Sequence, residues 1–395
     1  MGKPISKTRH KGIRAGLDNA VRQAEERNLH DLFVVDADCH QMEPFAELAK
    51  FIDSPYKEVF LSGDKEDDPL LSGRDEGLLN NKSTVKQVHY GPGRRKRSEI
   101  TYPEPQSPDE IIQILTQRMQ DIGIKVSVIF PTTLLSVATD PRHDFEVGVM
   151  NAYMDFMLEH FLGKYPEILS PVCVPVNSPD KAAELIHRIG PEKGVIGVMI
   201  PSMTPTLAGD DSWDPIYEAA QEEDLPICMH SNNYVGGFFG GFQKFIGVHA
   251  LSRPVTMAIQ VTSIVLNGVP ERFPKLKFLF IEGGVTWIPW IMQRLDAVYL
   301  MRREEAPLLT KKPSEYIKDF YFTSQPLEFT EMSDLNYSFK KFDAENHLLF
   351  ASDYPHWDFD LPSSIYDLPF LTETAKRKIL GQNAAKFFGI PEMAT

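Results

Sequence analysis

Eight short apolar segments recur along the chain, and most of them follow a segment with helical periodicity. They are rich in β-branched and aromatic residues, and they cover residues 32–38, 126–131, 168–176, 195–201, 225–230, 276–284, 319–324 and 346–355. Strands that are apolar on both faces and separated by helices are typical of a parallel sheet. Eight such strands predict closure into a (β/α)8 barrel, the TIM barrel of the α/β class.

Two regions fall outside this repeat. Residues 1–30 are predicted to be an N-terminal extension with one exposed helix, and residues 52–107 are rich in Gly, Pro, Asn and charged residues. The second region is predicted to be an insertion after the first strand. Residues 31–395 then form one barrel domain. We expect both additions to serve contacts between subunits, because an isolated exposed helix has little reason to fold alone.

Charge and cysteine content restrict the partners. The formal net charge of −14 disfavours nucleic acid and anionic membranes, and no apolar run approaches the length of a membrane span. The sequence begins without the apolar segment of a signal peptide, and its three cysteines are scattered. We therefore expect a cytoplasmic protein that acts on a small molecule.

Ligand-type side chains end four of the eight apolar runs. The carboxyl ends of barrel strands form the face that carries active sites. A buried carboxylate or imidazole there is costly unless it is paired, and a metal ion pairs with it well. Asp36, on the same side of the first strand, is expected to bond a ligand imidazole or a strand-end amide. The candidate ligands are Asp38 and His40 (first run), His230 (fifth), Glu282 (sixth), and Asp353 with the nearby His356 (eighth).

Four sequence motifs resemble the amidohydrolase-related family, a group that also contains decarboxylases. They are DADCHQMEP, RMQDIGIKVSVIFP, GVPERFPKLKFLFIEGGVTWIPWIMQRLD and LFASDYPHWD, and the resemblance covers about residues 32–390. It implies metal ligands at Asp38, His40, His230 and Asp353. In relatives, the aspartate that matches Asp353 also assists in activating a water molecule or a substrate hydroxyl.

The chain departs from the family pattern at three places. Asp38 stands where many members have His or Glu, which makes the ligand set more acidic. Glu282 stands where many members have a histidine that polarises the substrate. The fourth run, residues 195–201, contains no lysine. The carbamylated lysine that bridges two metals in some relatives therefore has no counterpart here.

Two arrangements of the site remain open. With one metal, Asp38, His40, His230 and Asp353 hold Zn or Mn, and His249 orients the substrate or acts as acid or base, supported by Glu282. With two metals, Glu282 is itself a ligand, and His249 or His356 completes the second site. One divalent ion is required in both arrangements, and the second belongs only to the latter.

These residues predict a metal-dependent hydrolase or non-oxidative decarboxylase that acts on a small organic acid or amide. The alternative enzyme is a dinuclear, iron-containing oxygenase on the same barrel, because imidazole and carboxylate ligands suit Fe(II). A further alternative is an inactive structural subunit of a hetero-oligomer. We expect the chain to form a homo-oligomer, with a hetero-oligomer containing a homologous subunit as the alternative.

Overall fold

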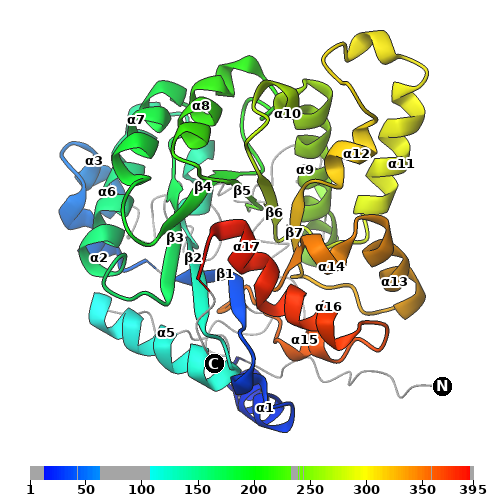
Figure 1. Cartoon of the computed structure of the whole chain (residues 1–395). Coiled ribbons are helices and arrows are strands. Elements are labelled where there is room, and N and C mark those ends of the chain that lie inside the picture. The colour runs from blue at the N-terminus through cyan, green and yellow to red at the C-terminus, as the bar shows by residue number, and fades with distance from the viewer. Residues whose placement is uncertain are drawn as a thin grey trace.

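A single parallel sheet of eight strands forms the centre of the protein (Figure 1). The computed structural model describes residues 13–41, 43–62, 107–232, 239, 241–242, 244–356 and 358–391. The strands follow one another in sequence order, from β1 to β8. Their bounds are β1 Val35–Gln41, β2 Val126–Pro131, β3 Ile168–Cys173, β4 Val195–Pro201, β5 Ile227–His230, β6 Phe278–Ile281, β7 Tyr321–Thr323 and β8 Leu348–Leu349.

Backbone hydrogen bonds between β1 and the segment after β8 close the sheet. The amide of Ala37 donates to the carbonyl of Phe350 at 2.9 Å, and the amide of Asp353 donates to the carbonyl of Asp38 at 2.8 Å. β1, β2, β3, β5 and β6 are buried at every position. The predicted (β/α)8 barrel is confirmed, and burial on both faces explains why its strands are apolar throughout.

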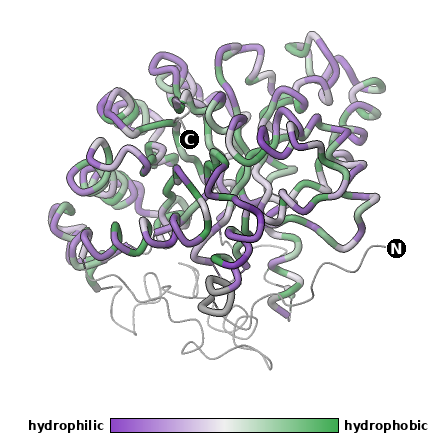
Figure 2. The backbone as a smooth tube through the Cα atoms, turned by 60° about the horizontal axis from the view of Figure 1, so that its bottom comes forward, coloured by the Kyte–Doolittle hydropathy of each residue, from purple (hydrophilic) through white to green (hydrophobic). Residues whose placement is uncertain are grey.

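Helices between successive strands cover the outside of the barrel (Figure 1). In Figure 2 hydrophobic segments concentrate in the centre, whereas much of the periphery is hydrophilic. None of the described helices is long and apolar enough to cross a membrane. The main helices are α5 Pro108–Ile122, α6 His143–His160, α7 Pro179–Ile189, α8 Asp214–Glu222, α9 Phe245–Leu266, α11 Ile288–Tyr299, α13 Met332–Lys341 and α17 Asn383–Phe388.

The helix α5 has clear start and stop signals. The side chain of Ser107 accepts a hydrogen bond from the amide of Glu110, and Pro108 occupies the first turn. Gly123 follows the helix with φ +86°, in the left-handed region that favours glycine. The chain then turns directly into β2, which begins at Val126.

The N-terminal helix α1 (Ile13–Glu26) is not simply exposed, as the sequence predicted. Ala20 and Ala24 are buried against the barrel domain. The guanidinium of Arg27 holds the Asp367 carboxylate with its Nε and Nη2 atoms at 2.7 and 2.6 Å. Two small alanines gave too weak an apolar stripe to reveal this face in the sequence.

The predicted insertion at residues 52–107 is described only at its ends. A short helix, α3 (Tyr56–Ser62), lies inside its first part, and Phe60 stacks on Phe45 with ring centroids 4.9 Å apart. Residues 63–106 lie outside the described residues. The insertion and its proposed role in subunit contacts therefore stay predictions.

Candidate metal centre

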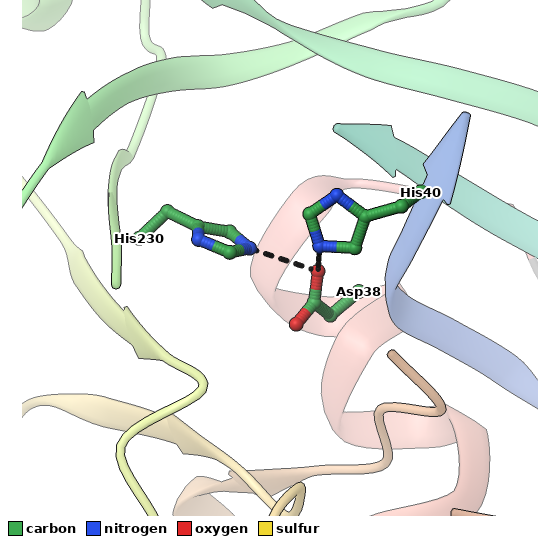
Figure 3. Close-up of side chains that lie close together, drawn as sticks. All are labelled: Asp38, His40 and His230. Atoms are coloured by element: carbon green, nitrogen blue, oxygen red, sulfur yellow. Dashed lines mark hydrogen bonds and ion pairs between the residues drawn. The ribbon is translucent and has the colours of Figure 1, made fainter. Parts of the chain in front are cut away.

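Asp38, His40 and His230 meet at the carboxyl end of the barrel (Figure 3). The Oδ1 atom of Asp38 lies 3.1 Å from His230 Nε2 and 3.3 Å from His40 Nε2. All three side chains are fully buried. Both imidazoles thus point at one carboxylate oxygen, although residue 230 is far from the other two in sequence.

Backbone carbonyls fix the orientation of both imidazoles. His40 Nδ1 lies 3.0 Å from the carbonyl oxygen of Pro131, and His230 Nδ1 lies 2.6 Å from that of Ser231. A carbonyl oxygen only accepts, so each Nδ1 carries the proton and donates it. The Nε2 atoms are then the ones available to a metal, and second-shell bonds of this kind are usual for metal-binding histidines.

A second group shares His40 and adds Asp353 and His356. The Oδ1 atom of Asp353 lies 3.2 Å from His40 Nε2 and 2.6 Å from His356 Nδ1. Asp353 has φ +57°, in a left-handed conformation that costs a non-glycine residue energy. Its amide is held by the carbonyl of Asp38, so the backbone that closes the barrel also places this carboxylate beside the first group.

The buried carboxylates fit a divalent cation. The Oδ2 atoms of Asp38 and Asp353 are buried and accept no hydrogen bond from the described residues. In Figure 3 the second oxygen of Asp38 points away from both imidazoles. A buried carboxylate oxygen without a donor carries a large desolvation penalty, which coordination to a cation would offset. Carboxylate and imidazole are ligands that Zn, Mn and Fe all accept.

The electrostatics of the metal-free site agree with this fit. Burial alone would raise the pKa of Asp38, but His230 and His40 hold it below its ordinary value. Burial would lower the pKa of His40, yet its hydrogen bonds to Asp353 and Asp38 hold it well above its ordinary value. A proton on the His40 imidazole therefore supplies positive charge where a metal ion would supply it instead.

Asp36 fixes the end of β8 rather than a ligand imidazole. Its Oδ1 atom accepts from the amide of Ser352 at 2.8 Å, and its Oδ2 atom accepts from the Ser352 hydroxyl at 2.5 Å. Burial raises the pKa of Asp36 to about 7 against these hydrogen bonds. Of the two predicted roles, the structure shows the bond to a strand-end amide.

Glu282 lies beside His230 but belongs to neither group. It follows β6 with φ +62°, and its amide donates to Thr323 Oγ1 at 3.0 Å. Its carboxylate accepts hydrogen bonds from Ser231 Oγ and Arg253 Nε, and its Oε2 atom is 3.9 Å from His230 Nδ1. Glu282 thus adjoins the nitrogen of His230 that faces away from Asp38. A direct ligand role for Glu282 stays a prediction.

The structure places Asp358 beside His249 and Arg253 beside Glu282, and the predicted support of His249 by Glu282 stays a prediction. His249 Nε2 lies 3.0 Å from Asp358 Oδ2, and the carboxylate of Glu282 forms an ion pair with Arg253. The sequence interpretation missed both Asp358 and Arg253. One signal was present, since His249 and Arg253 are four residues apart on α9 and so share a helix face. The acid or base role of His249 stays untested.

The amidohydrolase family model matches residues 101–390, and the chain belongs to this family. The resemblance predicted from the motifs is thereby confirmed. The curated relatives include the 2-amino-3-carboxymuconate-6-semialdehyde decarboxylase of Dictyostelium discoideum, 24% identical over 221 residues. That alignment covers 55% of this chain and 60% of the relative, so the chain spans less than two thirds of its length. The gamma-resorcylate decarboxylase of Rhodococcus jostii is 18% identical over 293 residues, covering 68% of this chain and 87% of that protein.

Solved structures share the fold. The 5-carboxyvanillate decarboxylase of Sphingomonas paucimobilis superposes with a TM-score of 0.65 at 18% identity, over 91% of this chain and 100% of that one. A dihydroxybenzoic acid decarboxylase from Polaromonas, solved with manganese and 2-nitroresorcinol, has a TM-score of 0.61 at 15% identity, over 91% and 97% of the two chains. These likenesses establish the amidohydrolase barrel fold.

Proposed function

We propose that the chain is a metal-dependent, non-oxidative decarboxylase of a small carboxylic acid. The observation that carries the proposal is the buried Asp38–His40–His230 group, in which a carboxylate oxygen lacks a donor among the described residues. The named relatives that support the choice of reaction are decarboxylases, and one related structure contains manganese. Hydrolysis of an amide, the other predicted reaction, has no such support among those relatives.

Asp38, His40, His230 and Asp353 are the residues that would hold the ion. A divalent ion bound there would supply positive charge to a substrate oxygen and so stabilise negative charge that develops during the reaction. The chain's own contribution is orientation. The hydrogen bonds from Nδ1 to backbone carbonyls fix the two imidazoles, and the hydrogen bond from the amide of Asp353 to the carbonyl of Asp38 fixes the second carboxylate.

Asp353 and His356 are the residues that could transfer the proton needed in decarboxylation. Decarboxylation breaks the bond between the carboxyl carbon and its neighbour, leaves the electron pair on that neighbour, and releases CO2. A proton must then join the carbon that carried the carboxyl group. His356 Nδ1 donates a hydrogen bond to Asp353 Oδ1 at 2.6 Å, which gives a proton a short path between the two side chains. Burial would raise the pKa of Asp353, but His356 and His40 hold it well below its usual range.

The proposal is tested by CO2 release. The manganese-loaded chain is incubated with a panel of hydroxylated aromatic and unsaturated carboxylic acids, and CO2 is measured together with the loss of each acid. We expect equal amounts of CO2 and decarboxylated product from at least one acid, without uptake of O2. Release of ammonia or amine from amide substrates, with no CO2 from any acid, would replace this proposal by the hydrolase. Turnover by the isolated chain would also exclude the inactive-subunit alternative.

A dinuclear oxygenase is the second candidate, and one observation favours it. Asp353, His40 and His356 form a second group of ligand-type atoms that adjoins the first. Together the two groups offer two carboxylates and three imidazoles. Two equivalents of iron per chain and O2 consumption coupled to hydroxylation would favour this candidate. One equivalent of metal with no O2 consumption would dismiss it.

Subunit arrangement and location stay predictions. We expect a homo-oligomer, which light scattering on the intact chain and on a chain lacking residues 1–28 would test. The three cysteines are buried and free, as expected for a protein of the cytoplasm.

A further inference from the structure

Arg253 brings a buried positive charge to the edge of the metal centre. It lies on α9, its side chain is only 11% exposed, and its Nε atom donates to Glu282 Oε1. Glu282 in turn lies 3.9 Å from His230 Nδ1. The guanidinium is thus separated from a candidate metal ligand by a single carboxylate.

The way Arg253 binds its carboxylate differs from that of other arginines in the chain. Arg27 and Arg142 each hold an aspartate with both Nε and Nη2, in the paired geometry that satisfies one edge of the guanidinium. Arg253 uses Nε alone, and its four Nη hydrogens meet no acceptor within the described ranges. A largely buried arginine therefore retains a pair of donors of the kind that binds a carboxylate.

The charges around Arg253 include carboxylates of the candidate metal centre. Burial alone would lower the pKa of Arg253, but Glu282, Asp358 and Asp353 raise it above its ordinary value. Asp353 belongs to the metal-binding groups and Asp358 holds His249. The guanidinium thus lies within electrostatic reach of both, and it remains charged at every pH at which the protein is folded.

We propose that Arg253 binds the carboxylate of the substrate through its Nη hydrogens, while Glu282, itself bonded by Ser231 Oγ, holds the guanidinium in position. This inference rests on the proposed function, because it assumes a carboxylate ligand at the metal centre. Glu282 then positions the guanidinium that binds the substrate. This role explains why a carboxylate lies beside the metal centre although it belongs to neither group of candidate ligands. The ion pair forms with the bound substrate, so its loss raises KM more than it lowers kcat.

Two probes separate charge recognition from general packing. Salicylate and salicylamide have the same ring and the same hydroxyl, but only salicylate carries a carboxylate. Their affinities for the manganese-loaded protein are measured by calorimetry in wild type, Arg253→Gln, Arg253→Lys and the control Arg272→Gln. Arg272 is a matched control because it is also largely buried and paired with a carboxylate, Asp214, on α10 (Val269–Arg272) before β6.

We expect wild type to prefer salicylate over salicylamide by at least tenfold, and Arg253→Gln to lose that preference while keeping its affinity for salicylamide. Arg253→Lys should retain part of the preference, because it keeps the charge but not the paired donors. Arg272→Gln should keep all of it.

Three outcomes would overturn the inference: a wild type that binds neither probe or does not distinguish them, an Arg253→Gln variant with the preference intact, or one that loses manganese by elemental analysis. The binding test needs no turnover. A chain that prefers salicylate but releases CO2 from no acid would therefore refute the proposed function and leave the role of Arg253 standing.

Discussion

Two regions of the barrel bury carboxylates in opposite ways. In the metal centre, Asp38 and Asp353 face imidazoles, and their pKa values lie below the ordinary range despite complete burial. On α6, Glu146 is also fully buried, but it faces the amide of Asn177, with Nδ2 at 2.9 Å and the backbone N at 3.3 Å. Burial raises the pKa of Glu146 to about 7 against these hydrogen bonds.

The difference shows that the partner, more than burial itself, decides what a buried carboxylate can do. Neutral amide donors offset only part of the free-energy cost of burying a charged carboxylate. Protonation of the carboxylate, which removes its charge, is then favoured. Imidazoles that carry positive charge keep a carboxylate ionised, and an ionised carboxylate is what a metal ion needs. The metal centre is therefore prepared for a cation, whereas the site around Glu146 is prepared for a proton.

The largest effect is expected from removing an imidazole of the metal centre. His230→Ala should lose bound manganese after dialysis and, with it, all turnover, because the ligand group then has one nitrogen fewer. Elemental analysis of the dialysed protein measures the loss. His187→Ala is the control, since His187 is half exposed and pairs with Glu223 on the barrel surface. Unchanged manganese content in His230→Ala would mean that His230 is not a metal ligand, and the comparison would lose its first premise.

Changing the charge of one carboxylate should come next. Asp353→Asn keeps the shape of the side chain, but its neutral amide cannot take up a proton from His356. We expect a loss of about 10³-fold in kcat, or about 4 kcal/mol of transition-state stabilisation, with the fold intact by circular dichroism. Asp367→Asn, which changes the surface partner of Arg27, is the matched control. Near-normal turnover would remove Asp353 from the mechanism.

Removing the charge of Glu146 on α6 should change the free energy of unfolding and its dependence on pH. The folded pKa of Glu146 is about 7, above the ordinary 4.5. Between these values the folded state binds more protons than the unfolded state, so the stabilisation present below pH 4.5 is lost as the pH rises to 7. A shift of this size corresponds to a loss of up to about 3 kcal/mol.

Glu146→Gln cannot titrate, so its free energy of unfolding should gain on that of wild type as the pH rises from 4.5 to 7. Urea unfolding at pH 5 and pH 7 measures this difference. Glu159→Gln, an exposed position later on the same helix, should give a curve parallel to wild type. If Glu146→Gln also runs parallel, Glu146 is not protonated in the folded protein, and the contrast with the metal centre disappears.

The smallest effect is expected from removing the Ser352 hydroxyl, which donates a hydrogen bond to Asp36. Ser352→Ala removes one of its donors and should lower the free energy of unfolding by about 1–3 kcal/mol, the usual cost of an unsatisfied buried group. Ser338→Ala is the comparison, because its buried hydroxyl donates to a neutral backbone carbonyl. An equal cost in both variants would mean that the charge of the acceptor makes no difference here.

The sequence was sufficient for the barrel and for naming the five residues that the structure brings together in two groups of candidate ligands. Apolar runs and helical spacing identify parallel strands, and residues at strand ends converge on one face wherever the barrel closes. Arg253 and Asp358 were missed because helices and loops approach that face from directions that strand spacing does not encode. The left-handed conformations of residues 282 and 353 were equally hidden, since neither position is a glycine.

The hydrogen bond from the amide of residue 353 to the carbonyl of residue 38 has a consequence for the order of assembly. It joins β1, the first strand of the barrel, to the segment that follows β8, the last, and both joined residues are candidate ligands. A nascent chain that has released only its first seven strands lacks Asp353 and the closing seam. The four candidate ligands Asp38, His40, His230 and Asp353 thus come together only once the chain extends past β8.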